Sequence, residues 1–203
     1  MKDTLGHPAC DYRLKVVANR LKNSLSGVAF IARIGGDEFA AVLPGIEDTQ
    51  ALLGAGYKLF ADTAMPLTYQ GQTIYISLSM GGVIFPQQAA DSTAMIKAAD
   101  IALNELKKNG RGGVLCYDPV MSDAVDATRG QMELAKQLIS DEAILPFYQP
   151  KVRLEDGKII GLEALMRFFN SQGELCFPGD TWSAFENYAL VERIGYIIRD
   201  KVF

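Results

Sequence analysis

Two adjacent carboxylates, Asp37 and Glu38, follow a pair of glycines between two apolar runs. The runs cover residues 30–34 and 39–43, which predicts a β-hairpin with its tip at residues 35–38. Glycines at a tip allow positive φ angles and let a ligand come close to the backbone. Two carboxylates on such a tip suit a hard divalent cation that carries a phosphate. The same residues also fit an ordinary surface turn with solvated acids, so the rest of the chain has to decide.

The composition is that of a globular protein: 203 residues, 49% of them hydrophobic and 22% charged, with a net charge of −4. An acidic chain is poorly suited to neutralise nucleic-acid phosphates, so we expect no nucleic-acid partner. The three cysteines, Cys10, Cys116 and Cys176, have neither zinc nor disulfide spacing and fit a reducing cytosol. The single histidine, His7, excludes a His-based triad or a multi-histidine metal site. No apolar run has membrane-spanning length, and the N-terminus lacks a signal-peptide layout.

The hydrophobic pattern predicts an α+β fold for the first part of the chain, an antiparallel sheet with helices packed on it. Residues 1–8 are polar and contain Gly6 and Pro8, which predicts a loop. Beyond the hairpin, helices are expected to start at Asp11 and at residues 47–48 and 91–92, and strands to cover residues 67–69, 73–85 and 114–117.

The pattern changes after residue 119. Apolar side chains then step by four and three from Met121 to Ile139, which predicts a linker helix over residues 120–144 that packs on a neighbour. Two strands joined by a turn at residues 155–158 should follow, and residues 181–203 look helical in two pieces. We therefore expect a first domain over residues 1–119 and a second one over residues 145–203.

Four motifs in the first part resemble the GGDEF domains, the diguanylate cyclases. They are D-T-L-G-H at residues 3–7 with Asp11, A-R-I-G-G-D-E-F at residues 32–39, S-L-S-M-G at residues 77–81, and A-D-I-A-L at residues 99–103 followed by Lys107, Gly110 and Arg111. Chance occurrence of the G-G-D-E-F pentapeptide in a chain of this length is on the order of 10⁻⁴. The resemblance covers residues 2–118 and implies a nucleotidyl-cyclase-like fold whose first strand is missing here.

The resemblance also implies roles for single residues. Asp37 and Glu38 would bind Mg²⁺ or Mn²⁺ and help activate the 3′-hydroxyl that attacks the α-phosphate of a second GTP. Gly35 and Gly36 would let ribose and phosphate lie against the backbone. Asp11 would accept hydrogen bonds from guanine.

Lys107 and Arg111 would bind the distal phosphates, and their charge suits a triphosphate. They also fit solvated charges near a helix C-terminus.

A second stretch resembles the opening of an EAL domain, the cyclic-di-GMP phosphodiesterases, whose fold is a (β/α) barrel. Its motifs are Y-Q-P at residues 148–150 and E-A-L-M-R at residues 163–167. Glu163 would be a metal ligand, while Gln149 and Arg167 would contact the dinucleotide. Glu163 also fits a surface acid at a strand end. The tandem order is that of GGDEF–EAL hybrid signalling proteins.

Several departures limit what this chain can do. The family's further metal-binding aspartate lies on a strand ahead of Lys2. Asp37 and Glu38 alone would therefore leave the ligand set of an octahedral Mg²⁺ site incomplete. Lys2, Cys10 and Asn104 replace the family's asparagine, glycine and tyrosine. The product-binding R-x-x-D falls at residues 26–29 without its arginine or aspartate, so we expect no product inhibition there. A barrel needs all its strands, so we expect no phosphodiesterase activity from these residues and an inactive cyclase.

Three hypotheses follow. The leading one is a bacterial cytoplasmic protein that condenses two GTP to cyclic-di-GMP as a homodimer. It would be longer at both ends, with room for a membrane anchor upstream. The second is a GTP-binding regulatory domain that controls an EAL phosphodiesterase, and the third is a non-catalytic nucleotide receptor. The intact Asp37–Glu38 pair favours the first hypothesis, whereas Lys2 and the absent product site keep the second open.

Overall fold

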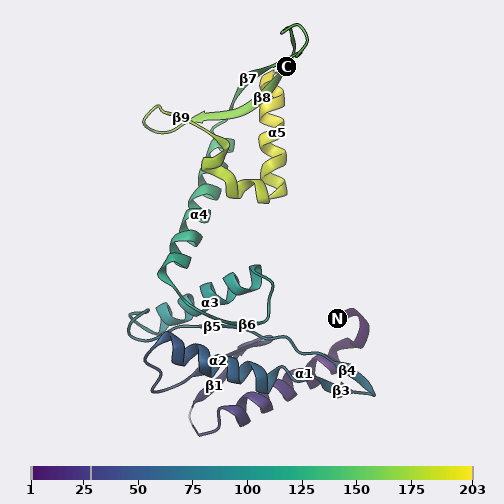
Figure 1. Cartoon of the computed structure of the whole chain (residues 1–203), viewed down its shortest axis with the longest axis vertical. Helices are drawn as coiled ribbons and strands as arrows, with labels where there is room; N and C mark the ends of the chain where they lie inside the picture. Colours follow the sequence, from purple (N-terminus) through teal and green to yellow (C-terminus); the bar gives the residue numbers. More distant parts are fainter. Residues whose placement is uncertain (1, 28, 203) are drawn as a thin grey trace. The chain divides into compact units, whose positions relative to one another are not determined.

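The computed structural model describes the backbone of residues 2–27 and 29–202, and the side chains from Pro8 onward. The chain forms two compact units that meet in sequence between Ser122 and Asp123 (Figure 1).

The first unit alternates helices with short strand pairs (Figure 1). Its elements are α1 (Lys2–Ser24), β1 (Phe30–Gly35), β2 (Glu38–Val42), α2 (Thr49–Thr63), β3 (Leu67–Tyr69), β4 (Gln72–Ile74), β5 (Ser79–Gly82), α3 (Ser92–Lys108) and β6 (Gly113–Cys116). The pairs β1–β2 and β3–β4 are antiparallel, as predicted for the two hairpins.

The predicted starts of α2 and α3 are confirmed, and both rest on aspartate caps. The Asp48 carboxylate accepts a hydrogen bond from the Ala51 amide at 2.7 Å. The Asp91 carboxylate accepts one from the Ala94 amide at 2.8 Å. Each cap satisfies an amide that has no partner within its own helix.

Three predictions for this unit are wrong. Residues 2–8 are helical and not a loop, because α1 begins at Lys2 and runs through Pro8. Pro8 is the seventh residue of α1, so the helix forgoes the bond that an amide there would make to the carbonyl four residues earlier. Gly6 and Pro8 therefore disfavour the helix here without preventing it.

The strand expected over residues 73–85 is two separate strands. β4 ends at Ile74 and pairs with β3, whereas β5 begins at Ser79 and pairs in parallel with β6. A parallel pair needs a long crossover, and α3 provides it. The expected single antiparallel sheet is therefore replaced, among the described residues, by two antiparallel pairs and one parallel pair.

The β5 strand is enclosed by helices on both faces. A Cβ built on Gly81 would lie 2.0 Å from the Ala99 carbonyl oxygen of α3, while one built on Gly82 would lie 2.9 Å from Leu52 of α2. Successive residues of a strand point to opposite faces, so α3 and α2 cover opposite sides of β5.

A separate apolar core joins α1 and α2 to the β3–β4 hairpin and the segment after it. Its buried members are Val17, Leu21, Leu25, Leu59, Leu67, Ile74 and Ile76. Arg20 ties the end of α2 to α1, since its guanidinium donates to the carbonyls of Thr63 and Pro66, each at 3.0 Å, and to that of Met65.

The second unit takes up most of α4 (Pro119–Ser140), so the expected linker helix forms but ends before residue 144. The elements that follow are β7 (Leu145–Val152), β8 (Ile159–Phe169), β9 (Leu175–Cys176), a 3₁₀ segment η1 (Pro178–Glu186) and α5 (Tyr188–Val202). On α4, a hydrogen bond to Glu133 and the charge of that carboxylate raise the pKa of Arg129 above its ordinary value.

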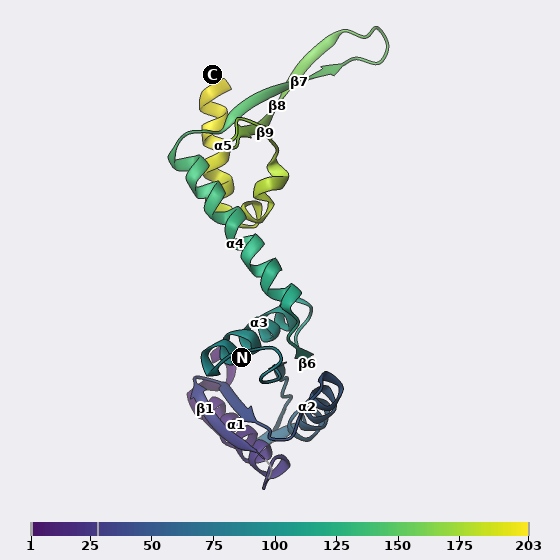
Figure 2. The same cartoon turned by 90° about the vertical axis from the view of Figure 1, so that its left-hand side faces the viewer.

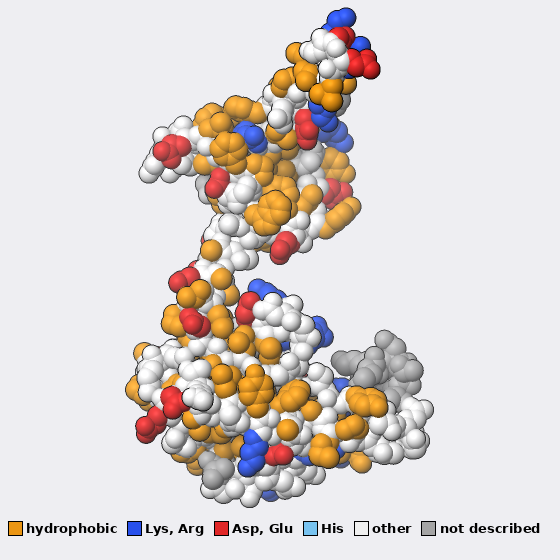
Figure 3. Space-filling view, in the orientation of Figure 1, with side chains coloured by type: hydrophobic (Ala, Val, Ile, Leu, Met, Phe, Trp, Pro, Cys, Tyr) orange, Lys and Arg blue, Asp and Glu red, His pale blue; other side chains and the backbone are white. Residues whose placement is uncertain are grey.

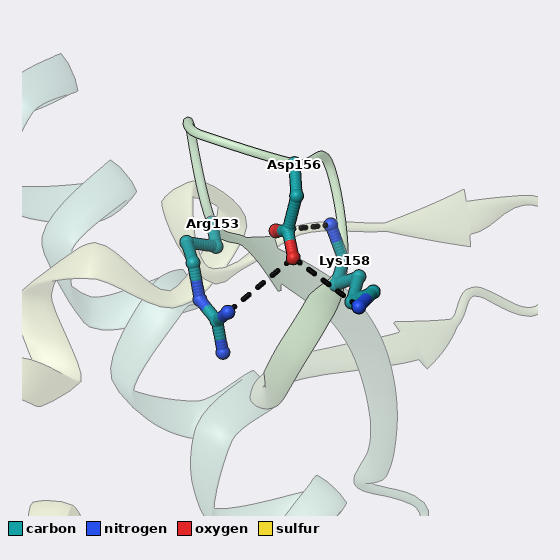
Figure 4. A network of polar contacts seen from close by, with 3 residues as sticks. All are labelled: Arg153, Asp156 and Lys158. Atoms are coloured by element: carbon teal, nitrogen blue, oxygen red, sulfur yellow. Dashed lines mark hydrogen bonds and ion pairs between the residues drawn. The ribbon is translucent and has the colours of Figure 1, made fainter.

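The β7–β8 ribbon projects beyond α5 (Figure 2). Its inner part packs on a core of Leu138, Ile144, Met166, Phe168 and Ile194. The predicted turn at its tip is confirmed: Asp156 contacts Arg153 at 3.3 Å and the Lys158 ammonium at 3.5 Å, and accepts a hydrogen bond from the Lys158 amide (Figure 4).

The outer part of the ribbon adds nothing to the core. Leu154 is 97% exposed, and Ile160 and Leu162 are also exposed. Figure 3 shows further apolar side chains at the surface of the second unit. Its sheet, in the order β7-β8-β9, is antiparallel and open, so the described residues form no closed barrel.

None of the helices in the described part of the chain is both long and apolar enough to span a membrane.

Candidate functional site

The hairpin tip is a two-residue turn. β1 ends at Gly35 and β2 begins at Glu38, and these two residues face each other in the ladder. Gly36 has a φ of +47°, in the left-handed region that favours glycine. No atom lies within 4 Å of a Cβ built on Gly35 or Gly36, so the backbone is open to a ligand. The predicted hairpin is confirmed.

Asp37 and Glu38 project from this turn into solvent, and both are exposed. The ladder shifts its register between Arg33 and Gly35, directly before the turn. A carboxylate pair on a short, supported turn can offer oxygen ligands to a hard cation without first ordering a long loop.

Arg33 braces the turn. Its Nε and Nη2 atoms both donate to the Gly36 carbonyl oxygen, at 3.0 and 2.6 Å. The planar guanidinium can make both bonds at once, which a lysine cannot. Arg33 was not among the predicted site residues, and only its place three residues before Gly36 could have indicated this role.

Beside the hairpin base, α1 and β1 line a groove of about 770 Å³. Asp11, the predicted guanine contact, belongs to its wall together with Lys15, Lys22 and Arg33. The remaining lining is mostly apolar and includes Phe30 and Phe39. The structure thus places Asp11 in one groove with the base of the hairpin, while Asp37 and Glu38 are not among the lining residues. The groove wall thus combines apolar side chains with one carboxylate and three cations, of which Arg33 is also bonded to Gly36.

Lys107 and Arg111 lie where α3 ends. Lys107 is in the last turn of α3 and Arg111 is in the loop that leads to β6. Both side chains are exposed, so both are available to an anion. The predicted pair therefore lies at the C-terminal end of α3 and directly after it.

The donor set for a metal is incomplete. Among the side chains of residues 8–27 and 29–202, no three His, Cys, Asp or Glu residues converge on one point. The carboxylates of Asp37 and Glu38 are the hard oxygen donors that Mg²⁺ prefers, but two residues leave most of an octahedral shell to water and substrate phosphates. They fit a metal site in part.

The departure at Lys2 concerns a side chain outside the described part of the chain. Cys10 is half-buried on α1. The Asn104 side chain donates to Asp100 at 3.1 Å along the surface of α3.

In the second unit, the ribbon brings two predicted residues together. Gln149 of β7 lies directly opposite Glu163 of β8, so both side chains are on one face. Arg167 is four residues along the same strand, on that same face, and its guanidinium lies 4.5 Å from the centre of the Phe177 ring.

Lys151 is a residue of this face that the sequence analysis missed. Its ammonium lies 3.4 Å from a carboxylate oxygen of Glu163. Alternation along β7 puts it on the side of Gln149, which could have indicated the contact.

Comparison with known proteins gives a family for the first unit. A family model described as "Diguanylate cyclase, GGDEF domain" matches residues 1–113. The protein "Cyclic di-GMP phosphodiesterase PdeR" of Escherichia coli is 31% identical over 204 residues, which cover 100% of this chain and 30% of PdeR. The "Bifunctional diguanylate cyclase/cyclic di-GMP phosphodiesterase MucR" of Pseudomonas aeruginosa is 28% identical, over 99% of this chain and 29% of MucR. The chain spans between a quarter and a third of these relatives.

A solved structure is similar as well. The GGDEF domain of TpbB (YfiN) from Pseudomonas aeruginosa matches with a TM-score of 0.58 and 28% identity, over 62% of this chain and 73% of that one. An EAL/GGDEF domain protein from M. capsulatus matches with a TM-score of 0.54 and 30% identity, over 58% of this chain and 76% of that one. Both likenesses confirm the α+β fold expected for this type of domain.

Proposed function

The chain belongs to the GGDEF family of diguanylate cyclases and is a cyclic-di-GMP signalling protein, and from this premise we propose that the complete protein condenses two GTP molecules into cyclic-di-GMP. The observation that carries the proposal is the hairpin tip. Asp37 and Glu38 stand on a two-residue turn whose Gly36 carbonyl is fixed by Arg33. Such a turn presents two carboxylates to a metal-bound nucleotide at little entropic cost.

In this proposal, Asp37 and Glu38 hold Mg²⁺ or Mn²⁺. When bound, the metal would supply charge for the phosphates and acidify the attacking hydroxyl. Asp11 accepts hydrogen bonds from guanine, and the bare backbone of Gly35 and Gly36 lets ribose and phosphate approach.

Lys107 and Arg111 bind the distal phosphates, for which their positive charge and exposure are suited. The product contains two nucleotides, and each hairpin carries one pair of carboxylates. A homodimer that brings two hairpins face to face is therefore the proposed active form.

The 203 residues alone are expected to be inactive as a cyclase. Two carboxylates do not complete a metal site, and the described residues bring no third acidic side chain to them.

The test uses the full-length protein with GTP and Mg²⁺, and the nucleotides are separated by chromatography. Asp37→Ala should lower cyclic-di-GMP formation by about 100-fold or more, since a metal-binding or proton-transferring carboxylate contributes on this scale. Asp123→Ala, which removes an exposed acid on α4, should leave the rate unchanged. Equal product from wild type and Asp37→Ala would refute the proposal, as would no product from wild type.

We also propose that the second unit is the opening of an EAL domain, with a linker over residues 120–144 and the domain from residue 145. Gln149 and Glu163 share one exposed face of the ribbon, and Arg167 follows on the same strand. In this role Glu163 would be one ligand of a metal, and Gln149 and Arg167 would contact the dinucleotide.

A regulatory role of the first unit would show in the same assay. GTP-stimulated breakdown of added cyclic-di-GMP by the full-length protein, with no synthesis, would favour a GTP-binding regulator over a cyclase. Binding of nucleotide without either reaction would favour a receptor.

A further inference from the structure

The S-L-S-M-G motif has no role in the proposed chemistry, yet its residues contact the end of α3. The Ser79 hydroxyl oxygen accepts a hydrogen bond from the Gly112 amide at 3.0 Å, across 33 residues of sequence and in a partly buried setting. Next to it, the Leu78 carbonyl accepts one from the Gly113 amide at 2.9 Å. Two adjacent residues thus hold two adjacent amides of the loop between α3 and β6.

Gly81 sets the position of α3 itself. It lies on the same face of β5 as Ser79, two residues away. A Cβ built on Gly81 would lie 2.0 Å from the Ala99 carbonyl oxygen and 2.6 Å from the Leu103 amide nitrogen. The helix backbone therefore rests directly on this glycine, one turn before Lys107.

The loop that Ser79 holds has an unusual backbone. Gly110, Arg111, Gly112 and Gly113 have φ angles of +121°, +61°, +79° and +120°. Arg111 is not a glycine, and a left-handed conformation costs such a residue free energy unless its surroundings fix it. The Arg111 amide itself donates to the Leu106 carbonyl at 3.3 Å, and the hydrogen bonds to Gly112 and Gly113 fix the backbone directly after Arg111.

We propose that Ser79 is a positioning residue for the recognition of the distal phosphates by Arg111, an inference that rests on the proposed function. Ser79 touches no nucleotide. It anchors the loop whose left-handed backbone directs Arg111, while Gly81 seats the helix turn that carries Lys107. Loss of the Ser79 hydroxyl frees the Gly112 amide and lets the loop sample other backbone conformations.

The experiment measures the affinity of the full-length protein for GTP and for GMP, in Mg²⁺, by titration calorimetry. Only GTP has the distal phosphates. Ser79→Ala should weaken GTP binding by about fivefold, the equivalent of one lost neutral hydrogen bond, and leave GMP binding unchanged. Arg111→Ala should do the same to a larger extent. Hydrogen exchange at the Gly112 amide should be faster in Ser79→Ala than in wild type.

Ser77→Ala is the matched control. Ser77 is exposed, and its hydroxyl lies beside the same loop, 3.2 Å from a Cβ built on Gly112, but makes no hydrogen bond to any residue in the described part of the chain. Its loss removes a neighbour of the loop and no bond to it, so GTP affinity should not change. An unchanged preference for GTP over GMP in Ser79→Ala would overturn the inference and leave the proposed function intact. Equal losses for GTP and GMP would also overturn it, because they indicate general damage. No preference for GTP in wild type would overturn both.

Discussion

Gly81→Ala is the substitution whose effect the structure defines most sharply. The new Cβ would meet the Ala99 carbonyl oxygen at 2.0 Å and the Leu103 amide nitrogen at 2.6 Å. Ordinary contact begins at 3.4 Å, so the gap to Ala99 would have to widen by 3.4 minus 2.0, or about 1.4 Å. Both atoms belong to the helix backbone and cannot rotate away. The strand and the helix must therefore separate.

Overpacking of this kind costs about 1–3 kcal/mol, and backbone partners put Gly81→Ala at the upper end, about 3 kcal/mol. The free energy of unfolding falls by about 1–3 kcal/mol per molar urea. A loss of about 3 kcal/mol should therefore lower the urea concentration at the unfolding midpoint by about 1 M or more. Circular dichroism follows the helices in a urea titration. The single tryptophan, Trp182, lies in the second unit and reports separately on that unit by fluorescence.

Gly54→Ala is the matched control, because Gly54 is exposed inside α2 and a Cβ built there has no atom within 4 Å. Alanine favours the helix over glycine by about 0.5–1 kcal/mol, so this change should raise the midpoint. A Gly81→Ala midpoint equal to or above that of wild type would refute the packing argument.

Two further substitutions test the scaffold of the first unit by thermal unfolding. Asp48→Ala should destabilise it by about 0.5–2 kcal/mol through loss of the α2 cap, whereas Asp48→Asn should be close to wild type. Arg20→Ala should lower the free energy of unfolding by about 1–3 kcal/mol, because the Thr63 and Pro66 carbonyls at the end of α2 lose a charged hydrogen-bond donor. An unchanged melting temperature in Asp48→Ala or Arg20→Ala would contradict the corresponding contact.

The sequence predicts elements well where the signal is local. The hairpin at residues 30–43 and the helix starts at residues 47–48 and 91–92 follow from turn and helix-terminus chemistry within a few residues, and all three are confirmed. The path between Ile74 and Ser79 could not be predicted in this way. Alternation shows that a segment is extended, but it does not show where a strand changes its partner from β3 to β6.

In the candidate site, too, local features could be predicted from the sequence and contacts across the fold could not. Residue types predict that Asp37 and Glu38 lie on a hairpin tip, and the structure confirms the tip. The brace from Arg33 to Gly36 and the bond from Ser79 to Gly112 depend on side-chain direction and on contacts across the fold. The spacing of Arg33 from the turn allows the first contact without specifying it, and the second contact joins residues 33 positions apart, so neither was predicted.

The middle of α4 has a consequence for how the protein can be dissected. Every residue from 123 to 130 is exposed, so these two turns receive no tertiary packing and include Gly130, a weak helix former. Short unpacked helical stretches open locally far more often than a core does. A protease needs an extended chain to cut, and Arg129 is a trypsin site in this stretch. Brief digestion of the native protein should therefore release the two compact units as separate fragments.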